Sequence, residues 1–183
     1  MSKKEKVIET ARELFSRYGY RISMDELAKE ANVTKKTIYS YFKDKDELIK
    51  YFLYEELNNI NKICDDINKK DIPFSSKLHE MMISTLDYQG NSKLLSAFEK
   101  ENRYTSNCLE IFTEEVVKSI KEKLDLAIKD GYLKKCDTSI TAFIIYKVYV
   151  ALKFEWKGKL DKKAISTQLT LVLTEGIIKQ GDE

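Results

Sequence analysis

The sequence predicts an all-α protein, with short helices at its N-terminus and longer helices after them. The chain of 183 residues contains one proline and six glycines, which is too few for a loop-rich β protein. Apolar residues recur every three or four positions through segments rich in strong helix formers. A chain of this length can bury a sizeable core, in one domain or in two small ones.

The first helix is predicted by one apolar stripe that ends at a glycine. The stripe comprises Val7, Ile8, Ala11, Leu14, Phe15 and Tyr18. Gly19 follows it and predicts a helix end in the left-handed conformation. Because the stripe occupies a single face, we expect this helix to pack on the next two and to complete a three-helix group.

Residues 23–42 predict two short helices joined by a tight turn. Ser23 and Glu26 have the spacing of a capping box, which marks the start of the first of these helices. Its apolar face comprises Met24, Leu27, Ala28 and Ala31. Thr34 can cap the second helix, which runs to Phe42. Two helices with so short a connection cross steeply, as in a helix-turn-helix.

The second short helix carries polar side chains on the surface that it does not use for packing. Val33, Ile38 and Phe42 are the residues expected to pack. The donor-rich residues are Lys35, Lys36, Thr37, Tyr39, Ser40 and Tyr41. Such side chains suit phosphate oxygens and base edges. On this pattern alone, an ordinary helical hairpin with a solvated basic face is an alternative.

An ordered series of residues extends from the first helix beyond the helix-turn-helix. It comprises Leu14, Phe15, Gly19, Tyr20, Ser23, Met24, Leu27, Ala28, Ala31, Val33, Thr34, Thr37, Ile38, Tyr39, Tyr41, Phe42, Lys45 and Leu48. Together these residues resemble the DNA-binding head of the TetR family of regulators. Lys36 stands where that family often has a small residue, and Tyr41 stands where it often has histidine. Beyond about residue 55 the resemblance is one of architecture only.

The resemblance implies contacts between this head and double-stranded DNA. Tyr39 and Lys45 would hold phosphates, and Ser23 and Thr34 would add backbone contacts. We expect Lys36 to reach a base, because a lysine donates to the guanine acceptors of the major groove. The expected DNA-binding residues are Ser23, Thr34, Lys35, Lys36, Thr37, Tyr39, Tyr41 and Lys45.

The distribution of charge agrees with a DNA-binding head. The formal net charge is +2, but lysine and arginine outnumber the acidic residues in the first fifty positions, whereas the remainder is slightly acidic. A basic head gives the electrostatic attraction that DNA binding requires. With the resemblance, this predicts a DNA-binding domain over 1–46 and a helical effector-binding and dimerisation domain over 47–183.

Further helices are predicted from apolar spacing and from helix breakers. A long helix starts at Lys45 and stops before Pro73, since proline disfavours helical geometry in the residue before it. Ser75 or Ser76 is expected to cap the next helix. Gly90 and Gly131 mark later breaks. The remaining predicted helices cover residues 76–86, 94–98, 109–128, 137–156 and 162–178.

The last two predicted helices carry more apolar surface than one core contact needs. The helix over 137–156 has two apolar stripes and must be covered on both sides. In the resembling family, the corresponding helices pair with their mates from a second chain. The resemblance thus implies a homodimer, and burial of both faces within one monomer is the alternative. The expected contact residues are Tyr146, Tyr149, Leu169, Val172 and Leu173.

A small-molecule site is expected where the long helix meets the next three helices. The candidate lining residues are Tyr54, Leu57, Met82, Leu86, Phe98, Tyr104, Phe112 and Val116. The mixture of methionine, tyrosine and phenylalanine suits an apolar ligand with a few polar groups. The class resemblance implies such an effector, and plain core packing is the alternative for each residue.

The sequence offers no motif for catalysis, a cofactor or a metal. His79 is the single histidine, and Cys64, Cys108 and Cys136 lack metal-ligand spacing. There is no phosphate-cradling glycine loop and no nucleophile elbow. The N-terminus lacks the apolar core of a signal peptide, and no apolar run reaches the roughly 20 residues of a membrane span. We therefore expect a cytoplasmic protein that is not an enzyme and has no membrane partner.

These expectations combine into a DNA-binding transcriptional regulator. In this interpretation, a repressor binds a palindromic operator as a dimer and is released by a small hydrophobic effector. One alternative is a helical protein–protein adaptor that does not bind DNA. The other is a DNA-binding protein of the same fold that lacks an effector.

Overall fold

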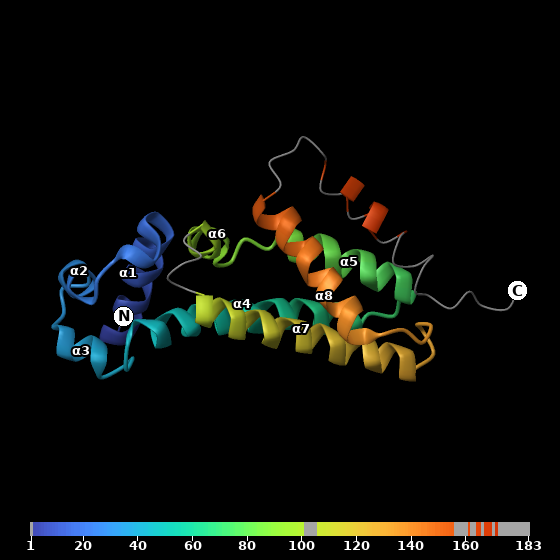
Figure 1. Cartoon of the computed structure of the whole chain (residues 1–183), viewed down its shortest axis with the longest axis horizontal. Coiled ribbons are helices and arrows are strands. Elements are labelled where there is room, and N and C mark those ends of the chain that lie inside the picture. Colours follow the sequence, from blue (N-terminus) through green and yellow to red (C-terminus); the bar gives the residue numbers. More distant parts are fainter. Residues whose placement is uncertain are drawn as a thin grey trace, which may run out of the picture. The chain divides into compact units, whose positions relative to one another are not determined.

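The computed structural model describes residues 2–100 and 106–155, together with residues 161, 164, 165, 167–169 and 171. Within these ranges the chain is helical and has no β-strand, which confirms the all-α prediction (Figure 1). The helices are α1 (Lys3–Tyr18), α2 (Met24–Glu30), α3 (Lys35–Tyr39), α4 (Lys45–Asn68), α5 (Phe74–Asp87), α6 (Ser92–Lys100), α7 (Ser106–Lys129) and α8 (Thr138–Val150). A 3-10 turn, η1 (Gly19–Arg21), follows α1, and a π-helical segment, η2 (Ala151–Glu155), follows α8.

Polar caps start the helices of the head as the sequence predicts. The Ser23 Oγ accepts a hydrogen bond of 3.1 Å from the Glu26 N–H, and the Glu26 carboxylate accepts one of 2.7 Å from the Ser23 N–H. The Thr34 Oγ1 accepts from the Thr37 N–H at 3.1 Å and so caps α3. These bonds satisfy backbone donors that have no partner inside the helix.

Two helix ends differ from the predictions. No serine caps α5, because that helix begins at Phe74 and both Ser75 and Ser76 lie inside its first turn. Pro73 precedes it, and the fixed φ of proline leads the chain into the helix without a side-chain cap. Gly19 has φ 65° and ψ −149°, which is not the left-handed helical conformation, because the chain turns there into η1. That backbone conformation is essentially restricted to glycine.

Contacts divide the chain into two compact units. Unit 1 contains the described chain through Leu57, with α1, α2, α3 and the start of α4, and also the described residues between Gly90 and Phe112, with α6. Unit 2 contains residues 58–89 and the described residues from Thr113 onward. The functional boundary between residues 46 and 47 stays a prediction. No helix among the described residues is both long and apolar enough to cross a membrane.

The core of unit 1 joins the helices of the head to the start of α4 and to α6. Its fully buried apolar side chains are Val7, Phe15, Leu27, Ile38, Leu48, Ile49, Phe52, Leu53 and Leu94. The rings of Phe15 and Phe52 meet edge to face with 6.3 Å between their centroids. α6 packs on α1 and on η1. The three-helix head is therefore one body with these two segments.

Unit 2 has a separate core between α7 and α8. Buried Leu124, Ala127, Leu133 and Ala142 form its centre, and Phe74 of α5 packs against them. At the other end of α5, the Lys153 ammonium donates hydrogen bonds to the carbonyls of Thr85, at 2.9 Å, and of Leu86, at 3.2 Å. Lysines near a helix C-terminus satisfy carbonyls that have no partner inside the helix.

Candidate nucleic-acid interface

α2 and α3 form the helix-turn-helix of unit 1. The turn between them places Asn32 at φ 50°, a left-handed conformation that asparagine tolerates better than most residues. Ile38 of α3 is fully buried, and Phe42 directly after it is 4% exposed. Because these two side chains pack into the head, the opposite side of α3 faces away from the core.

The outward side of α3 carries exposed polar groups. Thr34, Lys36, Tyr39 and Ser40 are exposed, whereas Thr37 is half-buried. The Ser40 hydroxyl donates to the Thr37 carbonyl at 2.7 Å, which holds it on the helix. Lys36 makes no ion pair or hydrogen bond with its side chain inside the described ranges, so its amine can meet a partner outside the chain.

Two other lysines of the expected set have partners within unit 1. The Lys35 Nζ lies 2.8 Å from the Asp25 carboxylate of α2, and this hydrogen bond raises the pKa of Lys35. Lys45 is half-buried, and its ammonium donates to the Tyr20 carbonyl. An ammonium has three N–H donors, so neither of these bonds prevents a further contact.

Tyr20 is held by the first two residues of α4. The Lys45 Nζ lies 3.9 Å from the centroid of the Tyr20 ring, and the Tyr20 hydroxyl donates to the Asp46 carboxylate at 2.9 Å. Burial, followed by the hydrogen bond to Asp46, raises the pKa of Tyr20 to about 12. These contacts attach the start of α4 to η1.

Two lysines outside the expected set also lie beside the helix-turn-helix. Lys43 is exposed in the turn between α3 and α4. The Lys4 Nζ lies 5.8 Å from the Phe42 ring centroid, which places the first turn of α1 beside the end of the helix-turn-helix. The cluster of lysines at the start of the sequence could have suggested Lys4 as a DNA-binding candidate. Only the fold shows that Lys4 lies beside Phe42.

A polar cluster within unit 1 joins α1, α4 and the start of α6. Two nitrogens of the Arg12 guanidinium donate to the two Glu55 oxygens at 2.9 and 3.2 Å, and Arg12 also donates to the Asn91 side chain. The Asn91 amide donates to the Phe52 carbonyl at 3.2 Å and to Glu55 at 3.0 Å. The Asn91 N–H donates to the Glu56 carboxylate at 2.9 Å. Sequence reasoning missed this cluster, because its members are far apart in the chain, with 79 positions between Arg12 and Asn91.

The candidate pocket residues are divided between the units. Tyr54, Leu57 and Phe112 belong to unit 1, where Leu57 is buried and Tyr54 is 42% exposed. Met82, Leu86 and Val116 belong to unit 2, where Leu86 is buried and the other two are half-buried. The Phe98 side chain and Tyr104 lie outside the described residues. The pocket stays a prediction.

The candidate dimer residues of α8 contact their own chain. Tyr146 is 7% exposed, and its hydroxyl lies 3.1 Å from the Thr113 hydroxyl of α7. The Tyr149 hydroxyl donates to the Thr85 carbonyl of α5 at 3.5 Å. Leu169 is half-buried, and Val172 and Leu173 lie outside the described residues. Tyr146 therefore retains little surface for a second chain.

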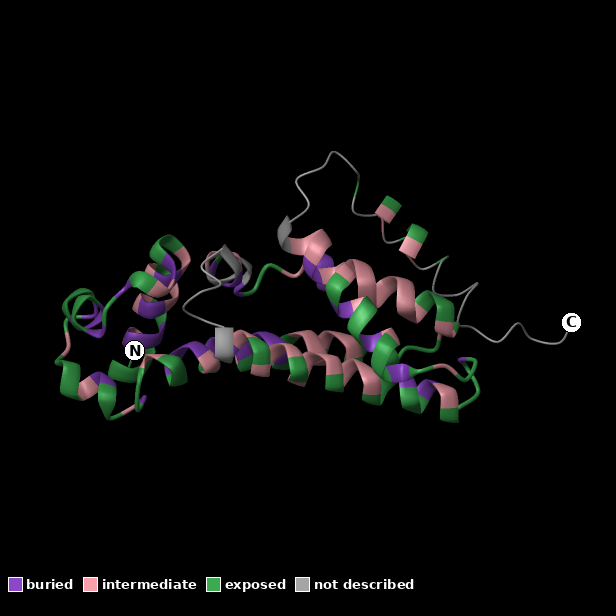
Figure 2. Ribbon diagram, in the orientation of Figure 1, coloured by how far each residue is buried: buried purple, intermediate pink, exposed green. Residues whose placement is uncertain are grey.

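Of the two apolar stripes on this helix, one includes Tyr146 and Tyr149, and the other, which includes Ile140, Phe143 and Ile144, is the exposed side of α8. Ile140, Phe143 and Ile144 are 60%, 48% and 54% exposed, at the spacing of one helix face. Figure 2 shows exposed and buried stretches alternating along α8. An apolar surface of this kind on a helix is typical of an interaction site.

The described residues contain no group of three or more histidine, cysteine, aspartate or glutamate side chains that could hold a metal ion. His79 is half-buried on α5. Burial raises the pKa of Cys64 and Cys108, which favours the unreactive thiol form.

Comparison with known proteins places this chain among transcriptional regulators. Residues 7–52 match the model of the family described as bacterial regulatory proteins, tetR family. The HTH-type transcriptional regulator YhgD of Bacillus subtilis is 30% identical over 186 residues, which cover 97% of each chain. Both matches are to regulators of transcription.

Solved structures of regulators share the fold. The fatty acid degradation regulator FadR of Bacillus halodurans matches with a TM-score of 0.73 and 20% identity over 96% of each chain. The TetR-family transcriptional regulator PfmR of Thermus thermophilus matches with a TM-score of 0.65 and 15% identity, over 93% of this chain and 97% of that one. With the match over the helix-turn-helix and the full-length similarity to YhgD, the chain is a DNA-binding transcriptional regulator that belongs to the TetR family.

Proposed function

We propose that this regulator is a repressor that binds a palindromic operator as a homodimer and is released by a small hydrophobic effector. The observation that carries the proposal is the outward side of α3. It presents the unpaired Lys36 amine beside the exposed Tyr39 phenol, on a helix whose other side is locked into the head by Ile38. Side chains of this kind on the second helix of a helix-turn-helix read base edges and hold phosphates.

Within this proposal, the DNA-binding residues divide into two groups. Lys36 contacts a base, because a flexible amine can donate to the O6 and N7 acceptors of guanine. Tyr39 and Thr34 contact the sugar–phosphate backbone, with Ser23, Thr37 and Tyr41 beside them. The Lys35 ammonium also donates to the Asp25 carboxylate, which lies 2.8 Å away.

The dimer contact in this proposal is the exposed stripe of α8. Ile140, Phe143 and Ile144 carry no charge and are each about half exposed or more. A second copy of the chain would cover this stripe with the same residues, as in a two-fold interface. Two heads then read two half-sites, at a separation of about 34–36 Å for sites one helical turn apart.

The effector in this proposal is an apolar compound with a few polar groups. The support is the chemistry of the candidate residues, which include Tyr54, Met82 and Phe112. Because FadR of B. halodurans is a regulator of fatty acid degradation, fatty acids are the first compounds to try. An effector that prefers the non-binding conformation by about 1–3 kcal/mol weakens DNA affinity roughly 5- to 150-fold.

Selection of binding sites from a pool of random-sequence duplexes tests the proposal. We expect an inverted repeat to be enriched, with one or more helical turns between the centres of its half-sites. Lys36→Ala should relax the preference at one base pair of each half-site, because that pair loses about 1–3 kcal/mol of discrimination. Enrichment of a single half-site would contradict the dimer, and no enrichment would favour the adaptor alternative.

Transcription in vitro from a promoter that carries the selected site separates the remaining alternatives. A repressor lowers the yield of transcript, and a fatty acid that acts as effector restores it. A protein that activates transcription from this promoter would contradict the repressor role. If a panel of fatty acids and other hydrophobic compounds leaves binding and transcription unchanged, the effector should be dropped.

A further inference from the structure

The first turn of α1 carries three lysines at a helix end that gains nothing from positive charge. Lys3 and Lys4 are exposed and Lys6 is half-buried, and their amines make no ion pair within the described ranges. Glu5 is the acidic residue of this turn, and its carboxylate accepts the Ser2 N–H at 2.8 Å in the capping box. Positive charge at a helix N-terminus opposes the helix dipole. The stability of α1 therefore does not explain these lysines.

Lys4 lies on the side of α1 that packs into the head. Val7 and Ile8 belong to the buried face of the helix, and Lys4 precedes them by three and four positions, so it shares their face. Lys6 is two positions further along, which is about 200° of rotation, and it lies on the opposite side. Lys4 therefore continues the buried stripe of α1 past the first apolar residue of the helix.

The Lys4 ammonium lies beside the end of the helix-turn-helix. Its Nζ is 5.8 Å from the centroid of the Phe42 ring, and Phe42 is itself 4% exposed. A cation–π contact draws on the charge of the ammonium and uses none of its three N–H donors. The ring therefore orients the Lys4 side chain and leaves all three donors for an anion.

The anion that suits this position is a phosphate of the DNA backbone. Exposed Tyr39, for which we propose a backbone contact, precedes Phe42 by three positions on the helix that would enter the groove. A phosphate accepts hydrogen bonds that are strengthened by charge, and it is present at every base step of a duplex. An amine that meets only phosphates adds affinity without a sequence preference.

We propose that Lys4 binds a phosphate of the DNA backbone beside the end of the helix-turn-helix, so that α1 adds a contact to those of α3. The inference rests on DNA binding by the helix-turn-helix. It gives Lys4 and Lys36 different roles. Loss of the Lys4 amine weakens binding to every sequence by the same factor, whereas loss of the Lys36 amine relaxes the preference at one base pair. Lys4 also contributes to the salt dependence of binding, because an amine that neutralises a phosphate releases counterions from DNA.

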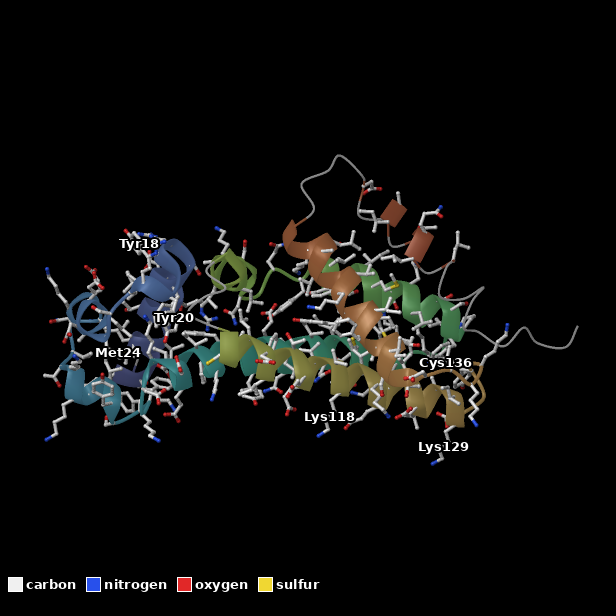
Figure 3. All side chains as sticks on the ribbon, in the orientation of Figure 1. Tyr18, Tyr20, Met24, Lys118, Lys129 and Cys136 are labelled. Atoms are coloured by element: carbon white, nitrogen blue, oxygen red, sulfur yellow. The ribbon has the colours of Figure 1, made fainter. Side chains whose placement is uncertain are left out.

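The test compares Lys4→Gln with two controls, Lys6→Gln and Lys118→Gln, in the full chain. Lys6 is in the same turn on the opposite side of α1, and Lys118 is an exposed residue of α7 in unit 2 (Figure 3). Dissociation constants are measured between about 50 and 200 mM salt, for the duplex selected from the random pool and for one of mixed sequence.

Lys4→Gln should weaken binding to both duplexes by the same factor, several-fold. It should also reduce the steepness of log K against log salt by about 1 for each bound chain. Lys4→Arg should restore both quantities, and the two controls should change neither. If Lys4→Gln does not fold, Lys4→Met takes its place, because it also removes the charge and keeps an unbranched apolar side chain beside Phe42.

Ethylation of single phosphates in the selected duplex locates the contact. The ethyl group removes the negative charge of one phosphate, so it weakens binding where a protein cation meets that phosphate. We expect one position in each half-site where ethylation weakens binding by the unmodified chain and no longer affects Lys4→Gln.

Each outcome supports or overturns the inference. An unchanged salt dependence in Lys4→Gln, or an ethylation pattern identical to that of the unmodified chain, overturns it. Equal changes in Lys4→Gln and Lys6→Gln also overturn it, because they would report only the net charge of the turn. A lower midpoint in urea unfolding with an unchanged salt dependence would mean that Lys4 acts only on stability, through Phe42, and would overturn the contact. These results leave DNA binding intact, whereas failure of the unmodified chain to bind either duplex overturns DNA binding and the inference together.

Discussion

Asn91 is a buried polar side chain through which α1 and α4 are linked in unit 1. It is 3% exposed, accepts a hydrogen bond from Arg12, and donates to the Phe52 carbonyl and to Glu55. A hydrogen bond to a charged group contributes about 1.5–3 kcal/mol, and one to a neutral group about 0.5–1.5 kcal/mol. Arg12 and Glu55 keep some access to water, with side chains 28% and 31% exposed, so they recover part of the loss. We expect Asn91→Ala to lower the free energy of unfolding by about 2–4 kcal/mol.

Urea unfolding followed by circular dichroism measures this loss. Gln89→Ala is the matched control, since Gln89 is an exposed amide two residues earlier, and its effect should stay within about 0.5 kcal/mol. A double-mutant cycle with Arg12→Met should show a coupling of about 0.5–3 kcal/mol, because Arg12 and Asn91 share one hydrogen-bond network. A loss below about 1 kcal/mol, or additive effects of the two substitutions, would refute the assignment of Asn91 as the centre of this cluster.

Three further predictions concern Glu55, α8 and Gly131. Burial raises the pKa of Glu55, but hydrogen bonds from Arg12 and Asn91 and the charge of Arg12 outweigh it, so the pKa lies below its ordinary value of 4.5. Ionised Glu55 therefore stabilises the fold fully above about pH 4.5, and this stabilisation is lost as the pH falls through the lowered pKa. Glu55→Gln should make the free energy of unfolding depend less on pH in this acidic range, as measured by urea unfolding at a series of pH values. Ile144→Asp should give monomers in sedimentation where the unmodified chain gives dimers, and an unchanged sedimentation coefficient would exclude this stripe as the contact. Gly131→Ala should cost about 1 kcal/mol in urea unfolding, because φ is +81° and no atom lies within 4 Å of the added methyl group; a larger loss would point to a contact made by the backbone there.

Local signals predicted the helices of the head well. The capping box of Ser23 and Glu26 and the cap at Thr34 depend on bonds between residues three positions apart, so spacing in the sequence is enough to find them. Gly131 likewise ends α7 with a positive φ, as a glycine at a helix end predicts. The conformation at the end of α1 was harder to predict. Gly19 is also the first residue of η1, so its backbone angles depend on that turn as well as on the helix.

Contacts across the chain could not be predicted in the same way. The sequence shows two apolar stripes on the helix over 137–156, but which of them is exposed depends on the packing of α5 and α7 against Tyr146 and Tyr149. The same holds for the lysines of the candidate DNA interface. Lys36 and Lys45 look alike in the sequence, and only the position of Tyr20 shows that one amine is restrained while the other is exposed.

The order of the chain also affects how unit 1 is completed during synthesis. Its first segment ends at Leu57 and its second begins at Gly90, so α5 is made between them. At about 5–20 residues per second, the ribosome reaches Asn91 seconds after the last residue of the first segment. Until then Arg12 lacks one acceptor, and the surface of α1 that packs on α6 is uncovered. A chain that ends anywhere between residues 58 and 89 therefore keeps every residue of the helix-turn-helix and yet lacks the helix that covers α1.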